Sequence, residues 1–311
     1  MSRSTPARRP ACFIVNPAAG GAPAPDKLRT AIDAAAAEFH LTADVRYTDA
    51  PGHATDLAAE AEQAGVPLIF VAGGDGSLNE ALNGLATSAP TLGVIPAGTA
   101  NVWAREAGVP RAPLAALRAQ LRGDAIDVDV GLAGDRRFLL MASFGLDAAA
   151  VASVGPGLKR RLGKAAYIVA GLRVGLRYPG FQLELAFDDE PAHTVDASMI
   201  VLGNTRWYGS LAQLTPRASA VDGMLDCVVF KGRGPWSSLR IIPRAALRRH
   251  LDSPHVLYRR AKRIRISATD GLPPMQLDGD AAVDPAVDLR VASRALTVFV
   301  PKVDQAVFRA T

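Results

Sequence analysis

The sequence contains few cysteines, few aromatic residues and no long apolar segment. Its two cysteines, Cys12 and Cys227, are far apart, and each falls in a stretch expected to form a strand. This indicates buried thiols without a disulfide, and a reducing, cytoplasmic setting. Prolines, glycines and Asn83 interrupt the long uncharged stretch from Ala81 to Ala104, so no run reaches the length of a membrane-spanning helix. The apolar run that follows the basic N-terminus is too short for a secretion signal.

Nucleic acid is disfavoured as a partner, although the net charge is +5. Aromatic residues make up 6% of the chain, and no zinc-ligand spacing or RNA-binding signature occurs. The excess charge is concentrated in two basic segments. Residues 158–177 contain six lysines and arginines and no acid, and residues 244–265 contain eight against one acid, Asp252. Such segments either form a solvated basic face or attract an anionic bilayer, and we expect contact with a bilayer.

The first 124 residues alternate short apolar runs with helical patterns. Strands are predicted at residues 12–15, 45–47, 68–71 and 92–95, and helices around residues 28–39, 57 and 78–85. This alternation is typical of a parallel sheet that is covered on both faces, whose ligands bind beyond the carboxyl ends of the strands. We therefore predict an α/β domain over residues 1–124.

The most informative segment is VAGGDGSLNEALNGL, Val71–Leu85. An apolar run meets a turn with three glycines, and leucines at helical spacing follow. Glycines let the backbone turn sharply and approach a ligand closely, and a helix N-terminus favours anions. The segment therefore predicts a phosphate-binding turn, with a plain strand-to-helix turn capped by Ser77 as the alternative. Asp75 in the turn is understandable if a metal ion lies between its carboxylate and phosphates.

Two further polar loops, residues 16–21 and 96–101, follow the first and fourth predicted strands. In a parallel sheet the carboxyl ends of the strands lie at one edge. We therefore expect these loops to converge on the glycine turn.

The pattern changes after about residue 124. Residues 126–130 alternate with period 2, and Gly134-Asp135 then turns the chain into residues 138–141, which predicts a hairpin. Further strands are predicted at residues 181–187, 198–202, 225–230, 264–266, 274–277 and 295–300, and helical inserts at 158–176 and 236–250. We predict a second, antiparallel domain of sandwich type over residues 125–311, whose last strands or tail could return to the first domain.

Five motifs occur in order along the chain. They are Asn16-Pro17-Ala18-Ala19-Gly20, Gly73-Gly74-Asp75-Gly76-Ser77 with Asn79-Glu80, Pro96-Ala97-Gly98-Thr99-Ala100-Asn101 with Ala104-Arg105, Val221-Asp222-Gly223-Met224-Leu225-Asp226, and Asp278-Gly279-Asp280. With them the chain resembles the diacylglycerol kinase catalytic-domain family, which includes sphingosine and ceramide kinases and soluble bacterial lipid kinases. One motif alone is weak evidence, since the glycine–aspartate turn also occurs in NAD kinases and phosphofructokinases. Five at family-like spacing are strong evidence, and they cover the chain from Phe13 to about Val300.

The resemblance implies an ATP- and magnesium-dependent lipid kinase that is cytoplasmic and peripheral to the inner face of the membrane. The positions that it assigns to ATP are Asn16, Pro17, Gly20, Thr48, Gly74, Asp75, Gly76, Ser77, Asn79, Glu80 and Thr99. It assigns magnesium to Asp222 and to the backbones of Ser219 and Met224.

The resemblance also implies catalytic carboxylates. Phosphoryl transfer needs charge neutralisation and an acceptor for the hydroxyl proton of the substrate. Asp280 stands at the family's general base with Asp278 beside it, and Asp75 would bind a metal or water. Simple hairpin turns are the alternative for Asp278-Gly279 and for Asp222-Gly223. Asp147 fits a segment near the lipid head-group, with a helix cap as its alternative.

The chain departs from the family at three positions. Ser77 replaces threonine and keeps the hydroxyl, Val102 replaces a common aspartate, and Asp280 replaces the usual glutamate with a side chain one methylene shorter. If Asp280 cannot reach, Asp75 is the next candidate base. An NAD kinase and a non-catalytic lipid or nucleotide sensor remain as alternatives. The sequence does not identify the acceptor lipid or the oligomeric state, although an exposed strand could pair with a second copy.

Overall fold

The structure is a computed structural model of the chain. It describes residues 8–86, 89–153, 173–209, 212–234, 236–237, 244, 249–268, 271–282, 288–301 and 305–309. None of the helices in these ranges has the length and apolar character that a membrane span requires.

The chain divides into two compact units. The first comprises Met1–Val128 and Arg294–Gln305, and the second comprises Asp129–Ser293 and Ala306–Thr311. Two strands, β5 and β17, run from one unit into the other.

The first unit contains a parallel sheet with the strand order β17-β4-β3-β1-β2. Its strands are β1 (Arg9–Val15), β2 (Leu41–Tyr47), β3 (Leu68–Gly73), β4 (Thr91–Pro96) and the end of β17 (Asp288–Val300). All six residues of β3 are buried, because helices cover both faces of the sheet. This burial explains the continuous apolar run in its sequence and confirms the predicted α/β fold.

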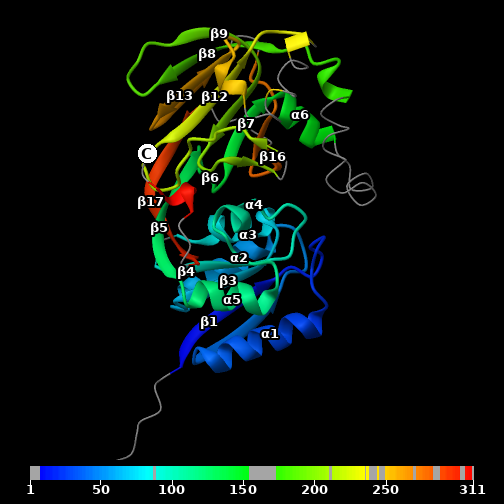
Figure 1. Ribbon diagram of the computed structural model, residues 1–311, viewed down its shortest axis with the longest axis vertical. Coiled ribbons are helices and arrows are strands. Elements are labelled where there is room, and N and C mark those ends of the chain that lie inside the picture. Colours follow the sequence, from blue (N-terminus) through cyan, green and yellow to red (C-terminus); the bar gives the residue numbers. More distant parts are fainter. Residues whose placement is uncertain are drawn as a thin grey trace, which may run out of the picture. The chain divides into compact units, whose positions relative to one another are not determined.

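Two pairs of helices pack on opposite faces of this sheet (Figure 1). The elements are α1 (Pro25–Glu38) with α5 (Pro113–Leu121), α2 (His53–Gln63) with α3 (Asp75–Gly84), and the short α4 (Val102–Glu106). Phe13 and Phe70 stack at 5.3 Å between ring centroids in the core on the α1 face, which also contains Leu117 of α5. Helices α4 and α5 were not predicted. A proline begins α5, where its missing N–H costs nothing.

The second unit is an antiparallel β domain, as predicted. Its sheet runs β16-β15-β7-β9-β8-β14-β17, with β12 paired to β9 and to β13. The elements are β5 (Asp124–Ala133), β6 (Arg136–Phe138), β7 (Met141–Gly145), α6 (Leu146–Ser153), β8 (Phe181–Phe187), β9 (His193–Gly203), β10 (Trp207–Tyr208), β11 (Ala212–Gln213), β12 (Leu225–Lys231), β13 (Val256–Ala261), β14 (Arg263–Ser267), β15 (Met275–Leu277) and β16 (Asp280–Ala282), with 3-10 turns at His250–Asp252 and Ala306–Phe308.

The predicted β5–β6 hairpin is present, with Gly131 opposite Phe138. Strand β13 was missed, because its two consecutive arginines suggested a solvated segment. The predicted helical inserts lie mostly outside the described residues, as do residues 158–172 of the first basic segment. Both cysteines are free and buried, and burial raises the pKa of Cys12 to about 11 and that of Cys227 to about 12.

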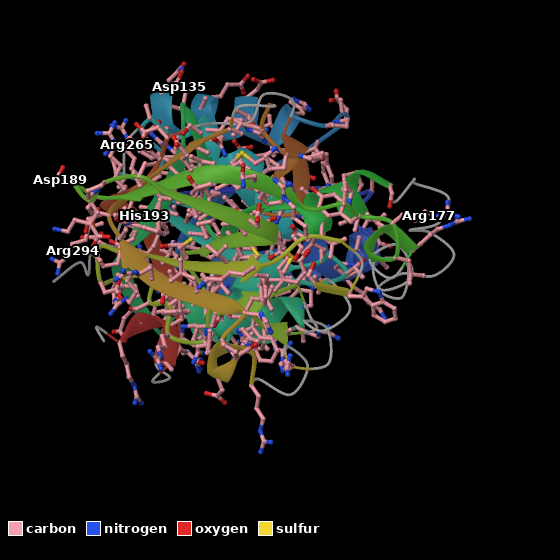
Figure 2. The ribbon with its side chains drawn as sticks, turned by 90° about the horizontal axis from the view of Figure 1, so that it is seen from above. Asp135, Arg177, Asp189, His193, Arg265 and Arg294 are labelled. Atoms are coloured by element: carbon pink, nitrogen blue, oxygen red, sulfur yellow. The ribbon has the colours of Figure 1, made fainter. Side chains whose placement is uncertain are left out.

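The described ends of the two basic segments lie apart. Figure 2 shows Arg177 and Arg265, both in the second unit, on opposite sides of the view. Arg177 and Arg265 therefore do not belong to one continuous basic face.

Candidate active site

The loops after β1, β3 and β4 meet at one edge of the sheet in the first unit. The strand order reverses between β1 and β3, because β2 lies beyond β1 and β4 lies beyond β3. The side-chain amide of Asn16 donates to Ser77 Oγ at 2.8 Å. The amides of Gly21 and Ala97 donate to the carbonyls of Ala97 and Gly73 at 2.8 and 2.9 Å. The expected convergence is thus confirmed, at the kind of switch point where open α/β sheets bind ligands.

Glycine brings the main chains of these loops unusually close. A Cβ on Gly98 would lie 2.5 Å from Cα of Gly74, and one on Gly20 would lie 3.0 Å from Thr99 Oγ1. A Cβ on Gly73 would lie 2.6 Å from Cβ of Ser77. The loops therefore present bare backbone, which suits the close approach of a phosphate group.

Helix α3 begins within this cluster. Its N-cap is Gly74, which has extended backbone and no capping side chain. The first amides of a helix have no partner inside the helix, and the aligned peptide dipoles place partial positive charge there. Gly76 and Ser77 lie in this first turn, so the site offers both N–H donors and a favourable potential to an anion.

Asp75 links the starts of two helices. Its carboxylate accepts a hydrogen bond from the amide of Trp103 at 3.1 Å, in the first turn of α4. Asn101, the N-cap of α4, is left-handed (φ 50°) and its Oδ1 accepts from the Gly98 amide at 2.8 Å. Burial raises the pKa of Asp75, and hydrogen bonds from the backbone of Val102 and Trp103 oppose the rise. The carboxylate therefore holds the third loop against α3.

Several other predicted nucleotide positions are open at the loop edge. Pro17, Gly20 and Thr99 are exposed. The amide of Thr48 donates to the carbonyl of Val15 at 2.9 Å, which places Thr48 beside the end of β1.

Glu80 and Asn79 instead bond to the protein itself. The Glu80 carboxylate accepts from the amide of Ala54 at 3.3 Å, and the Thr55 hydroxyl donates to the Glu80 carbonyl at 3.0 Å. Glu80 thus ties the start of α2 to α3. Asn79 is buried, and its carbonyl and Oδ1 accept from the side chain of Asn83 at 2.9 and 3.1 Å. The geometry gives both residues structural tasks.

In the second unit, Asp278 and Gly279 form the two-residue turn between β15 and β16. Their φ angles of 51° and 97° are typical of a tight hairpin turn. The Asp278 carboxylate accepts from the backbone amides of Leu139, Leu140 and Met141 at 2.7, 2.9 and 2.9 Å. Asp278 therefore anchors the turn to the segment that enters β7, while Asp280, the next residue but one, is exposed.

A buried polar cluster behind this turn centres on Asp147 of α6. Ser143 donates to its carboxylate at 2.6 Å, and the Tyr208 hydroxyl donates at 2.7 Å. Gln276 donates to Ser143 Oγ at 2.8 Å and accepts from the amide of Gly279 at 2.6 Å, so the cluster reaches the hairpin turn. Burial raises the pKa of Asp147, against the lowering effect of these donors.

Sequence reasoning singled out Asp147 but missed Ser143, Tyr208 and Gln276. These residues come from three separate segments, and no local pattern marks them. Only the sheet pairing brings Gln276 opposite Ser143.

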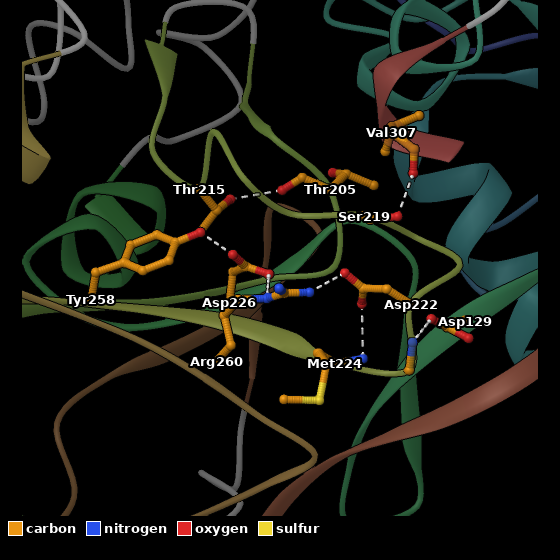
Figure 3. A network of polar contacts seen from close by, with 11 residues as sticks. Asp129, Thr205, Thr215, Ser219, Asp222, Met224, Asp226, Tyr258, Arg260 and Val307 are labelled. Atoms are coloured by element: carbon orange, nitrogen blue, oxygen red, sulfur yellow. Dashed lines mark hydrogen bonds and ion pairs between the residues drawn. The ribbon is translucent and has the colours of Figure 1, made fainter. Parts of the chain in front are cut away.

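The loop assigned to magnesium carries a different arrangement (Figure 3). Asp222 Oδ1 accepts from the amide of Met224 at 3.0 Å, and Oδ2 accepts from the guanidinium of Arg260. The Ser219 hydroxyl donates to the carbonyl of Val307 at 3.2 Å, and the amide of Gly223 donates to Asp129 at 2.6 Å. Oxygen donors are present, but a guanidinium already neutralises the carboxylate.

These residues do not fit a magnesium ion. The described residues contain no cluster of three or more histidines, cysteines and acids that could hold a metal. A divalent ion at Asp222 would also meet the charge of Arg260 at close range, which is unfavourable. We therefore assign no chemical step to a metal at this loop.

Comparison with known proteins agrees with the two units. Residues 10–133 match the diacylglycerol kinase catalytic domain, and residues 141–300 match the YegS C-terminal NAD kinase beta sandwich-like domain. The chain is 31% identical over 236 residues to a diacylglycerol kinase of Bacillus subtilis, covering 75% of this chain and 77% of that one.

Two further proteins are similar. A probable lipid kinase YegS-like of Chromohalobacter salexigens is 37% identical over 199 residues, which is 63% of each chain. The crystal structure of a diacylglycerol kinase from Bacillus anthracis superposes with a TM-score of 0.79 at 25% identity, covering 96% of this chain and 99% of that one. The chain therefore belongs to the diacylglycerol kinase family and is a lipid kinase.

Proposed function

We propose that the protein transfers the γ-phosphoryl group of ATP to a hydroxyl group of a membrane lipid. The observation that carries the proposal is the meeting of three bare-backbone loops with the N-terminus of α3 at the switch point of the sheet. Such a site binds phosphates through N–H groups and the helix dipole. The donor is taken as its magnesium complex, so that this magnesium arrives as part of the substrate.

The roles within the loop cluster follow from their contacts. The amides of Gly76 and Ser77 would bind phosphate oxygens, and the exposed hydroxyl of Thr99 would add a donor from the third loop. Asn16 fixes the Ser77 hydroxyl through its 2.8 Å hydrogen bond. The carboxylate of Asp75 accepts hydrogen bonds from the start of α4 and so positions the loops. These bonds account for the buried carboxylate without a metal ion.

Asp280 is the general base of the proposed reaction. It is exposed, and no hydrogen bond to its carboxylate is seen among the described residues. In the reaction Asp280 takes the proton of the lipid hydroxyl, the hydroxyl oxygen bonds to the γ-phosphorus, and the bond from phosphorus to the bridging oxygen of ADP breaks. Asp278 and the Asp147 cluster hold the hairpin that presents Asp280.

The acceptor lies in a membrane, so we propose a membrane-contacting surface on the second unit at the cytoplasmic side. Arg260 and Arg263 of the basic segment are already paired, with Asp222 and with Asp288. Arg259 instead lines an open cavity of about 540 Å³ together with Lys231, His193 and His255. Apolar side chains form much of the rest of its lining: Leu185, Phe187, Val195 and Leu257. Thr194, Gly232 and one acid, Asp196, complete it, and this acid is paired with Arg233 at 2.9 Å.

This combination of cations and apolar side chains complements an anionic lipid head-group with an acyl chain. Lys231 ends β12 and Arg259 lies on the neighbouring strand β13, and the amide of Lys231 donates to the carbonyl of His255, just before β13, at 2.8 Å. Lys231→Glu should weaken binding to phosphatidylglycerol vesicles about tenfold or more, at about 1 kcal/mol per charge near the surface. Arg136→Glu, a charge reversal at an exposed residue of β6 outside both basic segments, is the control. If both variants bound the vesicles equally well, the cavity would not be the membrane-contacting site.

The function is tested by incubating the protein with γ-labelled ATP, magnesium and a total bacterial lipid extract. Label should enter a lipid, and Asp280→Asn should abolish it while leaving ATP binding intact. Asp135→Asn, an exposed aspartate in the β5–β6 turn, is the matched control. Label in NAD, supplied in a parallel reaction, would favour an NAD kinase. ATP binding without transfer to any lipid would favour a sensor.

A further inference from the structure

Arg260 occupies the place at the Asp222 loop where the family resemblance puts magnesium. Its Nη2 donates to Asp222 Oδ2, and its Nε lies 3.7 Å from Asp226 Oδ2 (Figure 3). The side chains of Asp222 and Asp226 are 5% and 0% exposed, so both carboxyl groups are held away from water. A buried, ionised carboxylate requires a partner of opposite charge, and Arg260 supplies it to Asp222.

The sheet fixes this arginine in position. Strands β12 and β13 are antiparallel, and Arg260 lies directly opposite Asp226. Tyr258, two residues earlier on the same face, donates its hydroxyl to Asp226 Oδ1. Direct and diagonal neighbours across a strand pair are close enough to interact, so the register itself aims Arg260 at the loop.

Both carboxylate oxygens of Asp222 already accept a hydrogen bond from the protein. Oδ1 receives the amide of Met224 at 3.0 Å, and Oδ2 receives the guanidinium. Asp129 of β5, the carboxylate that the loop contacts, accepts from the amide of Gly223 at 2.6 Å and from the Ser293 hydroxyl at 3.0 Å. The loop is therefore closed by amides, hydroxyls and one arginine.

We propose that Arg260 is the built-in counter-cation of this loop and that the second unit folds without a bound metal. The guanidinium neutralises Asp222 and ties the loop to β13, which are the two tasks a structural cation would perform. Magnesium is then needed only as part of the nucleotide complex and not for folding. Activity assays cannot distinguish these two roles, because every assay contains magnesium.

Thermal unfolding without nucleotide separates the two possibilities. The melting temperature of the wild-type protein should be the same in excess EDTA and in millimolar Mg²⁺ or Ca²⁺. Arg260→Met, which keeps length and removes charge, should lower the melting temperature by at least about 5 °C. Arg259→Met, the adjacent residue with no partner among the acids of the loop, should lower it much less.

The proposal fails on either of two outcomes. A wild-type melting temperature that falls in EDTA and recovers with Mg²⁺ would show that a metal holds the loop. An equal loss in Arg260→Met and Arg259→Met would show that the pairing contributes nothing. If Arg260→Met does not fold, Arg260→Lys replaces it in the same comparison, because lysine keeps the charge and loses the planar fork that reaches both carboxylates.

Discussion

Replacement of Gly98 by alanine should damage nucleotide binding by separating two loops. The new Cβ would lie 2.5 Å from Cα of Gly74 and 2.9 Å from Asn101 Oδ1. Carbon atoms prefer a separation of about 3.5–4.0 Å, so the loops must move apart by roughly 1 Å. A displacement of that size at a reacting centre typically costs about 10²-fold in rate. We expect kcat/KM for ATP to fall by about 10²-fold, mainly through a higher KM.

Gly84→Ala is the control, because it overpacks the same unit away from the loops. A Cβ on Gly84 would lie 2.1 Å from the carbonyl oxygen of Thr55, where α3 packs on α2. This variant should lose about 1–3 kcal/mol of unfolding free energy. Its KM for ATP should stay near the wild-type value at temperatures where it is folded. Steady-state kinetics and thermal unfolding on both variants give the comparison, and a folded Gly98→Ala protein with unchanged ATP affinity would refute the phosphate-cradle assignment.

Three further predictions test other parts of the molecule. Glu80→Ala removes the carboxylate that accepts from the amide of Ala54 at the start of α2. It should lower the free energy of unfolding by about 1 kcal/mol, measured by heat or urea, without changing the KM for ATP. A large rise in this KM would show that Glu80 contacts the nucleotide. Burial raises the pKa of Asp226 to about 7; the charge of Asp222 adds to this rise, and the charges of Arg260 and Arg217 oppose it. The folded state therefore binds this proton more tightly than the unfolded chain does. The free energy of unfolding should fall as the pH rises from about 4 to about 7. Urea unfolding across this range should show the slope in the wild-type protein and a shallower one in Asp226→Asn; identical slopes would contradict the assignment. Asp280→Asn should reduce kcat by about 10²-fold or more with little change in ATP binding measured by calorimetry, whereas near-normal turnover would exclude Asp280 as the base.

The first unit could be predicted well because its signals are local. Strand β3 is buried on both faces and therefore reads as an unbroken apolar run, Leu68–Val71, and the turn after it carries its own glycines. The loop convergence followed from topology, since parallel strands must place their carboxyl ends together. The short α4 escaped notice because five residues carry too little periodicity, and its start depends on a left-handed Asn101 and on Asp75 from another loop.

The second unit was harder to predict because its polar residues are assembled by sheet pairing. In β13 the sequence Tyr258-Arg259-Arg260 suggests a solvated basic segment. In the register of β12 and β13, Arg260 lies opposite Asp226 and Arg259 lies opposite Cys227. The two adjacent arginines therefore have different surroundings. The Asp147 cluster likewise joins β7, β15 and the Tyr208 strand, and no spacing within one segment encodes it.

The catalytic assignment depends on a distinction that composition cannot make. Asp75, Asp222, Asp278 and Asp280 all stand beside glycines in turns, and from sequence each could bind a metal, accept a proton or cap a backbone. In the structure, Asp75 accepts from an amide in the first turn of α4, and Asp222 pairs with Arg260. Asp278 accepts from three backbone amides. A carboxylate whose lone pairs already bind the protein is a poor proton acceptor, because protonation would break those bonds. Of these four aspartates, Asp280 is the one that is exposed and whose carboxylate accepts no hydrogen bond from the described residues, and this is why the base assignment falls on it despite its shorter side chain.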